Sequence, residues 1–176
     1  MRLKLIAMFC VLMSATLAYG LQTEAEWVKF TSPDGRFSLL LPHQPKLEVV
    51  HDPANDKLVH NRFNGFEEGY GFVIECFDNL NITDPELYLD RTRDGILETL
   101  KGKLLRESKV SLDAYPGREL ELELTANGVK VSVTIRTYVV GSNLYSLSYI
   151  RRQDIDAAQA AKIGTRFFSS MKLEGK

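Results

Sequence analysis

Hydrophobic and polar residues alternate most regularly in the second half of the chain. From residue 119 to residue 124 the sequence reads Glu-Leu-Glu-Leu-Glu-Leu, so every second side chain is apolar. A period of two is typical of a strand with one buried face. Asn127-Gly128 follows and is the pair most favoured in a two-residue hairpin turn. The pattern predicts a hairpin of two strands, over residues 118–126 and 129–140.

The turn also predicts the register of this hairpin. A two-residue loop places Leu124 opposite Val131, Leu122 opposite Val133 and Leu120 opposite Ile135. These six side chains then share one face of the sheet. On the other face, Glu119 lies opposite Arg136, and Glu119, Glu121 and Glu123 form one polar strand face. Turn chemistry and cross-strand pairing therefore support the same register.

Shorter runs of the same kind predict the other strands. They cover residues 27–30, 36–41, 46–50, 57–66, 70–77, 104–112 and 143–151. Ser-Pro-Asp-Gly at 32–35 favours a turn, and Glu-Glu-Gly at 67–69 joins a hairpin. The stretch from His51 to Asp56 is polar and rich in turn formers, so we expect an exposed loop there.

Two helices are predicted from their ends and their apolar spacing. Asp84 caps the first, Pro85 occupies its first position and Gly102 ends it. Its apolar residues fall near one side and are Leu89, Ile96, Leu97 and Leu100. The second helix begins at Asp154 or Asp156, and the residues expected on its inner side are Ala160, Ile163, Phe167 and Met171. Long consecutive strands joined by tight turns predict an antiparallel sheet. With two helices packed on that sheet, the predicted fold class is α+β.

Composition agrees with a folded domain. Of the 176 residues, 44% are hydrophobic and 26% are charged, which excludes a disordered chain. The 22 basic and 23 acidic residues give a formal net charge of −1, so no basic excess points to nucleic acid. We expect a single domain over residues 27–173 and no nucleic-acid partner.

The first twenty residues have the pattern of a secretory signal peptide. Arg2 and Lys4 precede an apolar run over 5–13, and small residues follow. Cleavage fits after Ala18 or after Gly20, and the pattern does not separate the two. The run is shorter than the about twenty residues that span a bilayer, and no later stretch is long enough. We therefore expect an extracytoplasmic protein, periplasmic or secreted, that is soluble after cleavage.

Several segments together resemble the PsbP-like superfamily, which is named for an extrinsic subunit of photosystem II and includes non-photosynthetic bacterial relatives. They are Phe-Thr-Ser-Pro-Asp-Gly-Arg-Phe-Ser-Leu-Leu-Leu-Pro at 30–42, the single helix after the first strands, Pro-Gly-Arg-Glu at 116–119, and Phe-Phe-Ser-Ser-Met at 167–171. The resemblance implies an α/β/α sandwich, a central antiparallel β-sheet flanked by helices. It also implies an exported, non-enzymatic accessory or assembly role.

Candidate chemistry is sparse. Once Cys10 leaves with the signal peptide, Cys76 is alone, so we expect a buried thiol and no internal disulfide. His43, His51 and His60 have no metal-ligand spacing, although a weak metal site at His51, Asp52 and Asp56 stays open. We find no nucleophile–base pattern and no phosphate loop. We expect no catalytic residue, no cofactor and no enzymatic activity.

The best candidate for a partner surface is a set of tyrosines and arginines. Its members are Arg136, Tyr138, Tyr145, Tyr149, Arg151 and Arg152, residue types that binding hot spots favour. In the other interpretation, the tyrosines fill the core. We expect a non-catalytic accessory, assembly or protein-binding domain with a partner in the cell envelope. The alternative is a binder of a small apolar ligand in a cavity between helix and sheet, lined by Leu89, Ile96 and Phe167.

Overall fold

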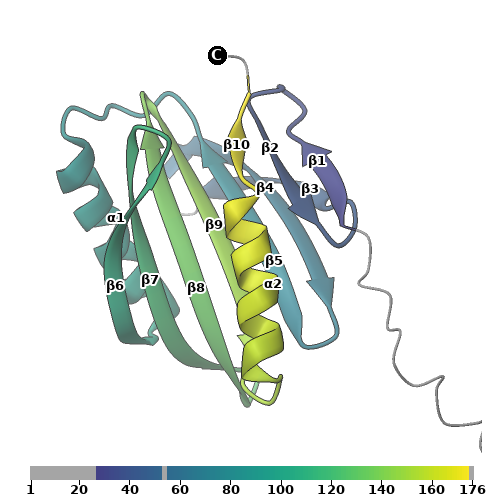
Figure 1. Ribbon diagram of the computed structural model, residues 1–176. Helices are drawn as coiled ribbons and strands as arrows, with labels where there is room; N and C mark the ends of the chain where they lie inside the picture. Colours follow the sequence, from purple (N-terminus) through teal and green to yellow (C-terminus); the bar gives the residue numbers. More distant parts are fainter. Residues whose placement is uncertain (1–26, 53–54, 175–176) are drawn as a thin grey trace, which may run out of the picture.

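The structure, a computed structural model, describes residues 27–52 and 55–174. Within these residues the chain forms ten strands and two helices (Figure 1). In chain order they are β1 (Val28–Thr31), β2 (Phe37–Leu41), β3 (Lys46–Asp52), β4 (Asn55–Glu67), β5 (Tyr70–Phe77), α1 (Pro85–Leu100), β6 (Lys103–Leu112), β7 (Tyr115–Ala126), β8 (Val129–Val140), β9 (Asn143–Arg152), α2 (Ala157–Ser169) and β10 (Lys172–Leu173). Neither helix is long and apolar enough to cross a membrane.

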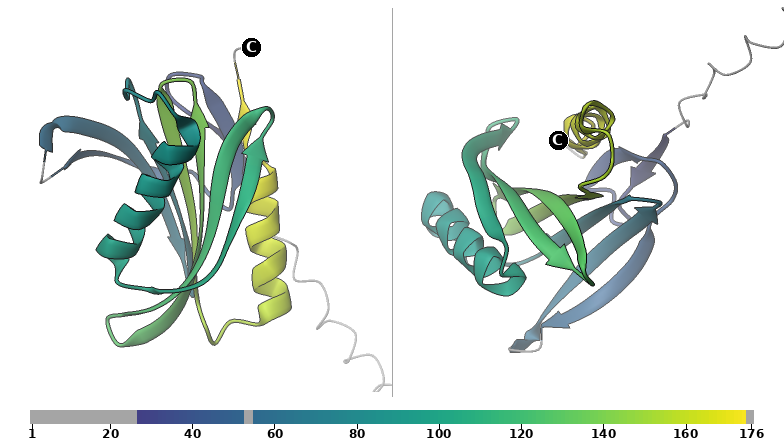
Figure 2. Two further views of the ribbon diagram at one scale, coloured as in Figure 1. Left: turned by 90° about the vertical axis from the view of Figure 1, so that its left-hand side faces the viewer. Right: turned by 90° about the horizontal axis from the view of Figure 1, so that it is seen from below.

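Seven of the strands form one antiparallel sheet in the order β3-β4-β5-β9-β8-β7-β6. The other three form a small sheet in the order β1-β2-β10. The helices lie on opposite faces of the large sheet, with α1 against β7 and β8 and α2 against β9 (Figure 2). This is the predicted α/β/α sandwich, and the small sheet beside α2 is an addition to it.

The predicted hairpin register is confirmed residue by residue. Leu124 pairs with Val131, Leu122 with Val133, Leu120 with Ile135 and Glu119 with Arg136. The apolar residues of this hairpin pack under α1, where they meet Ile96 and Leu97. The apolar positions of the period-two pattern therefore form the contact between α1 and the sheet.

The opposite face of the sheet carries the larger core. Aromatic side chains from both sheets and from α2 meet there, including Phe37, Phe72, Tyr145 and Phe167. The ring of Phe37 lies edge-on to that of Tyr145, with centroids 5.6 Å apart. This core ties the small sheet and α2 to the strands β4, β5 and β9.

Both helices begin where the sequence predicts, whereas α1 ends at a different residue from the predicted one. The side chain of Asp84 accepts a hydrogen bond from the Leu87 amide at 3.1 Å, and Asp156, rather than Asp154, caps α2. Gly102 was the expected end of α1. Instead Lys101 takes the left-handed conformation (φ 53°) and its amide donates to the Leu97 carbonyl, so the helix closes one residue earlier.

The exposed loop expected from His51 to Asp56 is a second correction. β3 continues through Asp52 and β4 begins at Asn55, so only residues 53–54 separate the strands, and these lie outside the described residues. The pairing of Val50 with His60 and of His51 with Val59 extends the ladder into the polar stretch. Cross-strand hydrogen bonding thus overrides the local preference for a turn.

An ion-pair network holds α1 on the sheet. Arg118 of β7 is buried beneath the helix, where it pairs with Glu107 of β6 and with Asp90 of α1. Arg93 of α1 also pairs with Glu107, at 3.2 Å. Burial opposes ionisation of Glu107, but the hydrogen bonds from Arg118 and Arg93 outweigh it and lower the pKa of the carboxyl.

We predict that Leu89→Ala destabilises the fold far more than Leu87→Ala. Leu89 is 0% exposed on the inner side of α1, and truncating a leucine in a packed core costs about 2–5 kcal/mol. Leu87 lies on the same helix with 46% exposure, so its truncation should cost less than about 1 kcal/mol. Urea unfolding of both variants measures the difference, and equal losses would contradict the assigned inner face of α1.

Candidate functional site

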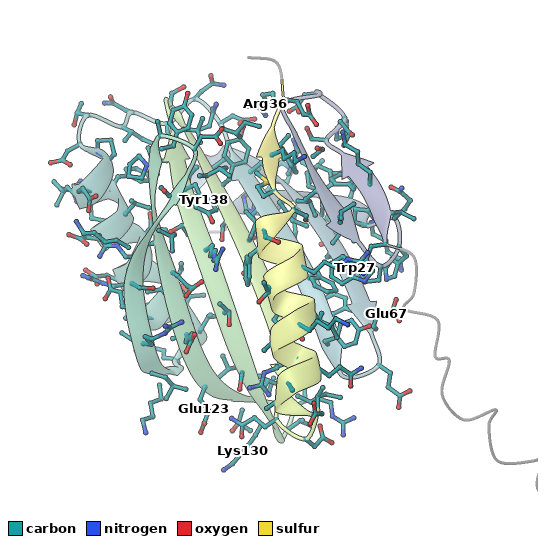
Figure 3. The ribbon with its side chains drawn as sticks, in the orientation of Figure 1. Trp27, Arg36, Glu67, Glu123, Lys130 and Tyr138 are labelled. Atoms are coloured by element: carbon teal, nitrogen blue, oxygen red, sulfur yellow. The ribbon has the colours of Figure 1, made fainter. Side chains whose placement is uncertain are left out.

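A groove runs between α2 and the strands β6, β7 and β8, on the face of the sheet opposite α1. Its volume is about 410 Å³, and we call it the α2 groove. The sheet side carries polar and charged residues, among them Glu119, Glu121, Thr134, Arg136 and Arg151. The helix side carries small residues, namely Ala157, Ala161, Gly164 and Thr165. Figure 3 looks onto this face, where side chains with nitrogen and oxygen ends stand on the strands beside α2.

The same alternation that buries leucines under α1 produces the polar floor of the groove. Successive side chains of a strand point to opposite faces. With Leu120 and Leu122 beneath α1, Glu119 and Glu121 must lie on the α2 side. The alternation over residues 119–124 therefore produces both the apolar surface beneath α1 and the charged floor of the groove.

Glu119 is the centre of the charged floor. It is only 6% exposed, and its two carboxylate oxygens accept from different arginines. Arg106 Nη2 lies 3.1 Å from Glu119 Oε1, and Arg136 Nε lies 2.6 Å from Oε2. Arg106 also reaches Glu121 at 2.6 Å. The guanidinium of Arg136 is further held 4.6 Å above the ring of Phe168, so the floor has a fixed geometry.

Tyr149 forms the inner wall, where α2 meets the sheet. Its ring stacks on Phe72 with centroids 5.5 Å apart, and Gly164 approaches it so closely that an added Cβ would lie 3.0 Å from the ring. The residue is 4% exposed, and its hydroxyl has no hydrogen-bond partner among the described residues. Burial raises the pKa of Tyr149 to about 12, and the charge of Arg151 opposes that shift.

Five of the six residues predicted for a partner surface share the α2 side of the sheet. They are Arg136, Tyr138, Tyr145, Tyr149 and Arg151. Arg152 has the opposite parity and pairs with Asp154. The three tyrosines are buried, because α2 and the small sheet cover this face. The three tyrosines therefore belong to the core, as in the other interpretation of the sequence, and the arginines are the accessible members of the predicted set.

Sequence reasoning missed several groove residues. Glu121 was assigned to an ordinary polar strand face, and neither Arg106 nor the small residues Ala157, Ala161 and Gly164 of α2 were singled out. The register that sets Glu119 opposite Arg136 was the available signal, since it joins two opposite charges on one face. How far these two charged side chains are buried depends on the position of α2, and no local sequence pattern predicts that position.

The remaining candidates lie apart from the groove. Cys76 is a free, buried thiol, as predicted, and burial raises its pKa to about 12. His43 lies 3.2 Å from Glu67, whereas His60 is buried against Phe77. Within the described residues, no three side chains are grouped to hold a metal ion. The side chains of Asp52 and Asp56 lie outside that description, so the weak site with His51 stays a prediction.

A second hollow, also about 410 Å³, lies on the α1 side of the sheet. Its lining is largely apolar and includes Leu100, Leu124, Val131, Ile150 and the exposed Phe66. We call it the α1-side hollow. Leu100, the last residue of α1, borders it, and the strands from β3 to β5 and from β7 to β9 supply the rest of its lining.

We predict that Glu119→Gln lowers the free energy of unfolding by about 2 kcal/mol, because the partly buried Arg136 loses a charged partner. The matched variant is Glu123→Gln on the same strand, which should cost less than about 0.5 kcal/mol. Urea titration of both proteins provides the comparison. Equal stability of the two variants would show that the groove floor is not held by Glu119.

We predict an alkaline loss of stability that depends on Cys76. Burial raises the pKa of the folded thiol from 9.0 to about 12. The folded state therefore favours the protonated thiol, so this contribution is complete below the pKa of the unfolded thiol and is lost as the pH rises toward 12. Between about pH 8 and about pH 10.5, the wild-type protein should lose about 2 kcal/mol more than Cys76→Ala. Denaturant titrations of both proteins at each pH measure the difference. The same pH dependence of the free energy of unfolding in the two proteins would contradict the prediction.

Neither a protein-family model nor a curated protein sequence matches the chain. Solved structures do. Cyanobacterial PsbP (CyanoP) of Synechocystis sp. PCC 6803 is 14% identical over 85% of this chain and 93% of its own, with a TM-score of 0.58. LpqN of Mycobacterium tuberculosis is 13% identical over 85% and 91%, with a TM-score of 0.55. Mog1p of Saccharomyces cerevisiae is 10% identical over 85% and 96%, with a TM-score of 0.50. At such identities the likeness concerns architecture alone, and the chain has the PsbP-like fold.

Proposed function

We propose that this protein is an exported, non-catalytic accessory domain that binds another protein of the cell envelope through the α2 groove. The groove itself carries the proposal. Its walls are strands and a helix rather than loops, and its charged floor is held by ion pairs on Glu119. A surface fixed in this way loses little conformational entropy when a partner binds, which favours recognition.

The accessible groove side of α2 suits a partner segment. Ala157, Ala161 and Thr165 are exposed there, one helical turn apart. Small side chains allow another chain to approach the helix closely, while arginines such as Arg136 and Arg151 are residues that interfaces favour. The groove thus combines a shallow wall with charged side chains that can select a partner.

Proteins of the same fold are consistent with this role. Mog1p is named a Ran-binding protein, and LpqN is described as involved in cell envelope biogenesis. These properties belong to those proteins, and we extend to this chain only the general role of a binding domain. The export pattern of residues 1–20, which lie outside the described residues, supports a place in the periplasm or outside the cell. A single domain over residues 27–173 is part of the same proposal.

The α1-side hollow favours a second candidate, a binder of a small apolar ligand. Its volume lies within the range of ligand sites, and its lining is largely apolar. The position differs from the one expected, because Leu89 and Phe167 are fully buried in packed clusters rather than lining a cavity.

We predict that a bulky charge in the α2 groove abolishes partner capture. Ala161→Arg fills the groove from an exposed helix position, and Ala158→Arg places the same side chain on α2 outside the groove lining. The mature protein and both variants would be used as baits on the envelope fraction of the source cell. A protein retained by the wild type and by Ala158→Arg, but lost with Ala161→Arg, is the expected result.

Two outcomes would overturn the proposal. Equal capture by Ala161→Arg would show that the partner binds elsewhere. A stoichiometric small apolar molecule in the eluate, without a protein, would favour the α1-side hollow and the second candidate.

A further inference from the structure

Two hydrogen-bond donors of the α2 groove have no partner among residues 27–52 and 55–174. Arg151 is half-buried and pairs with no carboxylate in the described part of the chain, although every other arginine of the groove does. The buried Tyr149 hydroxyl likewise has no hydrogen-bond partner in the part of the chain that the structure describes. The two side chains stand two residues apart on the same face of β9, and both line the groove. One acceptor could therefore receive hydrogen bonds from both.

An unpaired buried hydroxyl is costly to keep. Leaving a buried donor unsatisfied costs about 1–3 kcal/mol, and native proteins rarely do so without a reason. Phenylalanine would pack in the same place without that cost, because the ring contacts with Phe72 and Gly164 do not involve the hydroxyl. A ligand that accepts from the hydroxyl gives tyrosine a reason to be there.

The charges of the groove define the acceptor. Three arginines and two glutamates line it, which gives a net charge of +1. The ion pairs of Arg106 and Arg136 involve both glutamates, so the excess charge is that of Arg151. A single negative charge completes this balance. A phosphate dianion would exceed it and would also meet the repulsion of Glu119 and Glu121.

We propose that Arg151 and Tyr149 form a carboxylate-recognition point within the α2 groove, and that it takes an aspartate or glutamate side chain from an extended segment of the partner. Arg151 supplies charge-assisted donors and Tyr149 supplies the hydroxyl donor. Thr134 of β8 and Thr165 of α2 also line the groove, and their hydroxyls are available to the backbone of that segment. The inference rests on the proposed function and names the chemistry of its partner.

A pair of peptides that differ in one group tests the inference. The probes are acetyl-Ala-Glu-Ala-amide and acetyl-Ala-Gln-Ala-amide, which have nearly the same shape but differ in the carboxylate. Each is titrated into the isotope-labelled mature protein, and the backbone amide signals of Arg151, Ala157 and Ala161 are followed by NMR. We expect saturable shifts with the glutamate peptide and at least about tenfold weaker binding of the glutamine peptide.

Three variants assign the effect to side chains. Arg151→Gln should weaken binding of the glutamate peptide by about tenfold or more. Tyr149→Phe removes only the hydroxyl, so it should weaken binding several-fold while the thermal midpoint stays the same or rises. Arg152→Gln is the matched control, since it removes an adjacent arginine on the opposite face, and it should leave the affinity unchanged.

The opposite results would overturn the inference. These are equal affinity for the two peptides, an equal loss with Arg152→Gln, a thermal midpoint lowered by Tyr149→Phe, or tighter binding of inorganic phosphate than of the glutamate peptide. The experiments distinguish failure of the carboxylate-recognition inference from failure of the proposed function. Partner capture that needs an open groove but survives Arg151→Gln would overturn this inference alone. Binding of the glutamate peptide without any groove-dependent partner would overturn the proposed function alone.

Discussion

Antiparallel pairing of β7 with β8 decides which side chains meet on each face of the large sheet, and both helices depend on it. In the observed register the leucines of β7 and the branched residues of β8 form the surface on which α1 packs. The glutamates of β7 then face α2, across from Arg136 and Thr134 of β8. A slip of one residue would exchange the two faces, exposing the leucines to the groove and burying carboxylates beneath α1. Core packing and groove chemistry therefore have a common origin in the Asn127-Gly128 turn.

Two adjacent residues show how closely these roles are joined. Arg118 and Glu119 are neighbours in β7, yet both are buried, on opposite faces of the sheet. Arg118 is surrounded by carboxylates from α1 and β6, and Glu119 by arginines from β6 and β8. Burying either charge without partners would cost several kcal/mol. Each is therefore tied to its own set of opposite charges, and β6 contributes to both, with Glu107 on one side and Arg106 on the other.

Local sequence signals predicted the parts of the fold that depend on neighbouring residues. The β7–β8 register, the Asp84 cap and the burial of Cys76 all follow from short patterns, and all are observed. Long-range contacts account for the differences. Strand pairing extends β3 and β4 into a polar stretch, and β10 joins β2 only because α2 returns the chain to the first strands. The groove also belongs to this second class. Its residues come from β6, β7, β8, β9 and α2, and parity alone could not say that Tyr149 is covered while Arg151 stays accessible.

Gly164 links the interior of the protein to the dimensions of its groove. Because this residue has no side chain, the backbone of α2 packs directly against the ring of Tyr149. Any larger residue at this position would have to lift the helix or tilt the ring. Either movement would alter the separation between α2 and the strands that carry Glu119 and Arg136, while every charge in the groove remained the same. Within this architecture, a single core position can therefore set the width of the opening, so that relatives could acquire different binding preferences without changing a residue that touches the ligand.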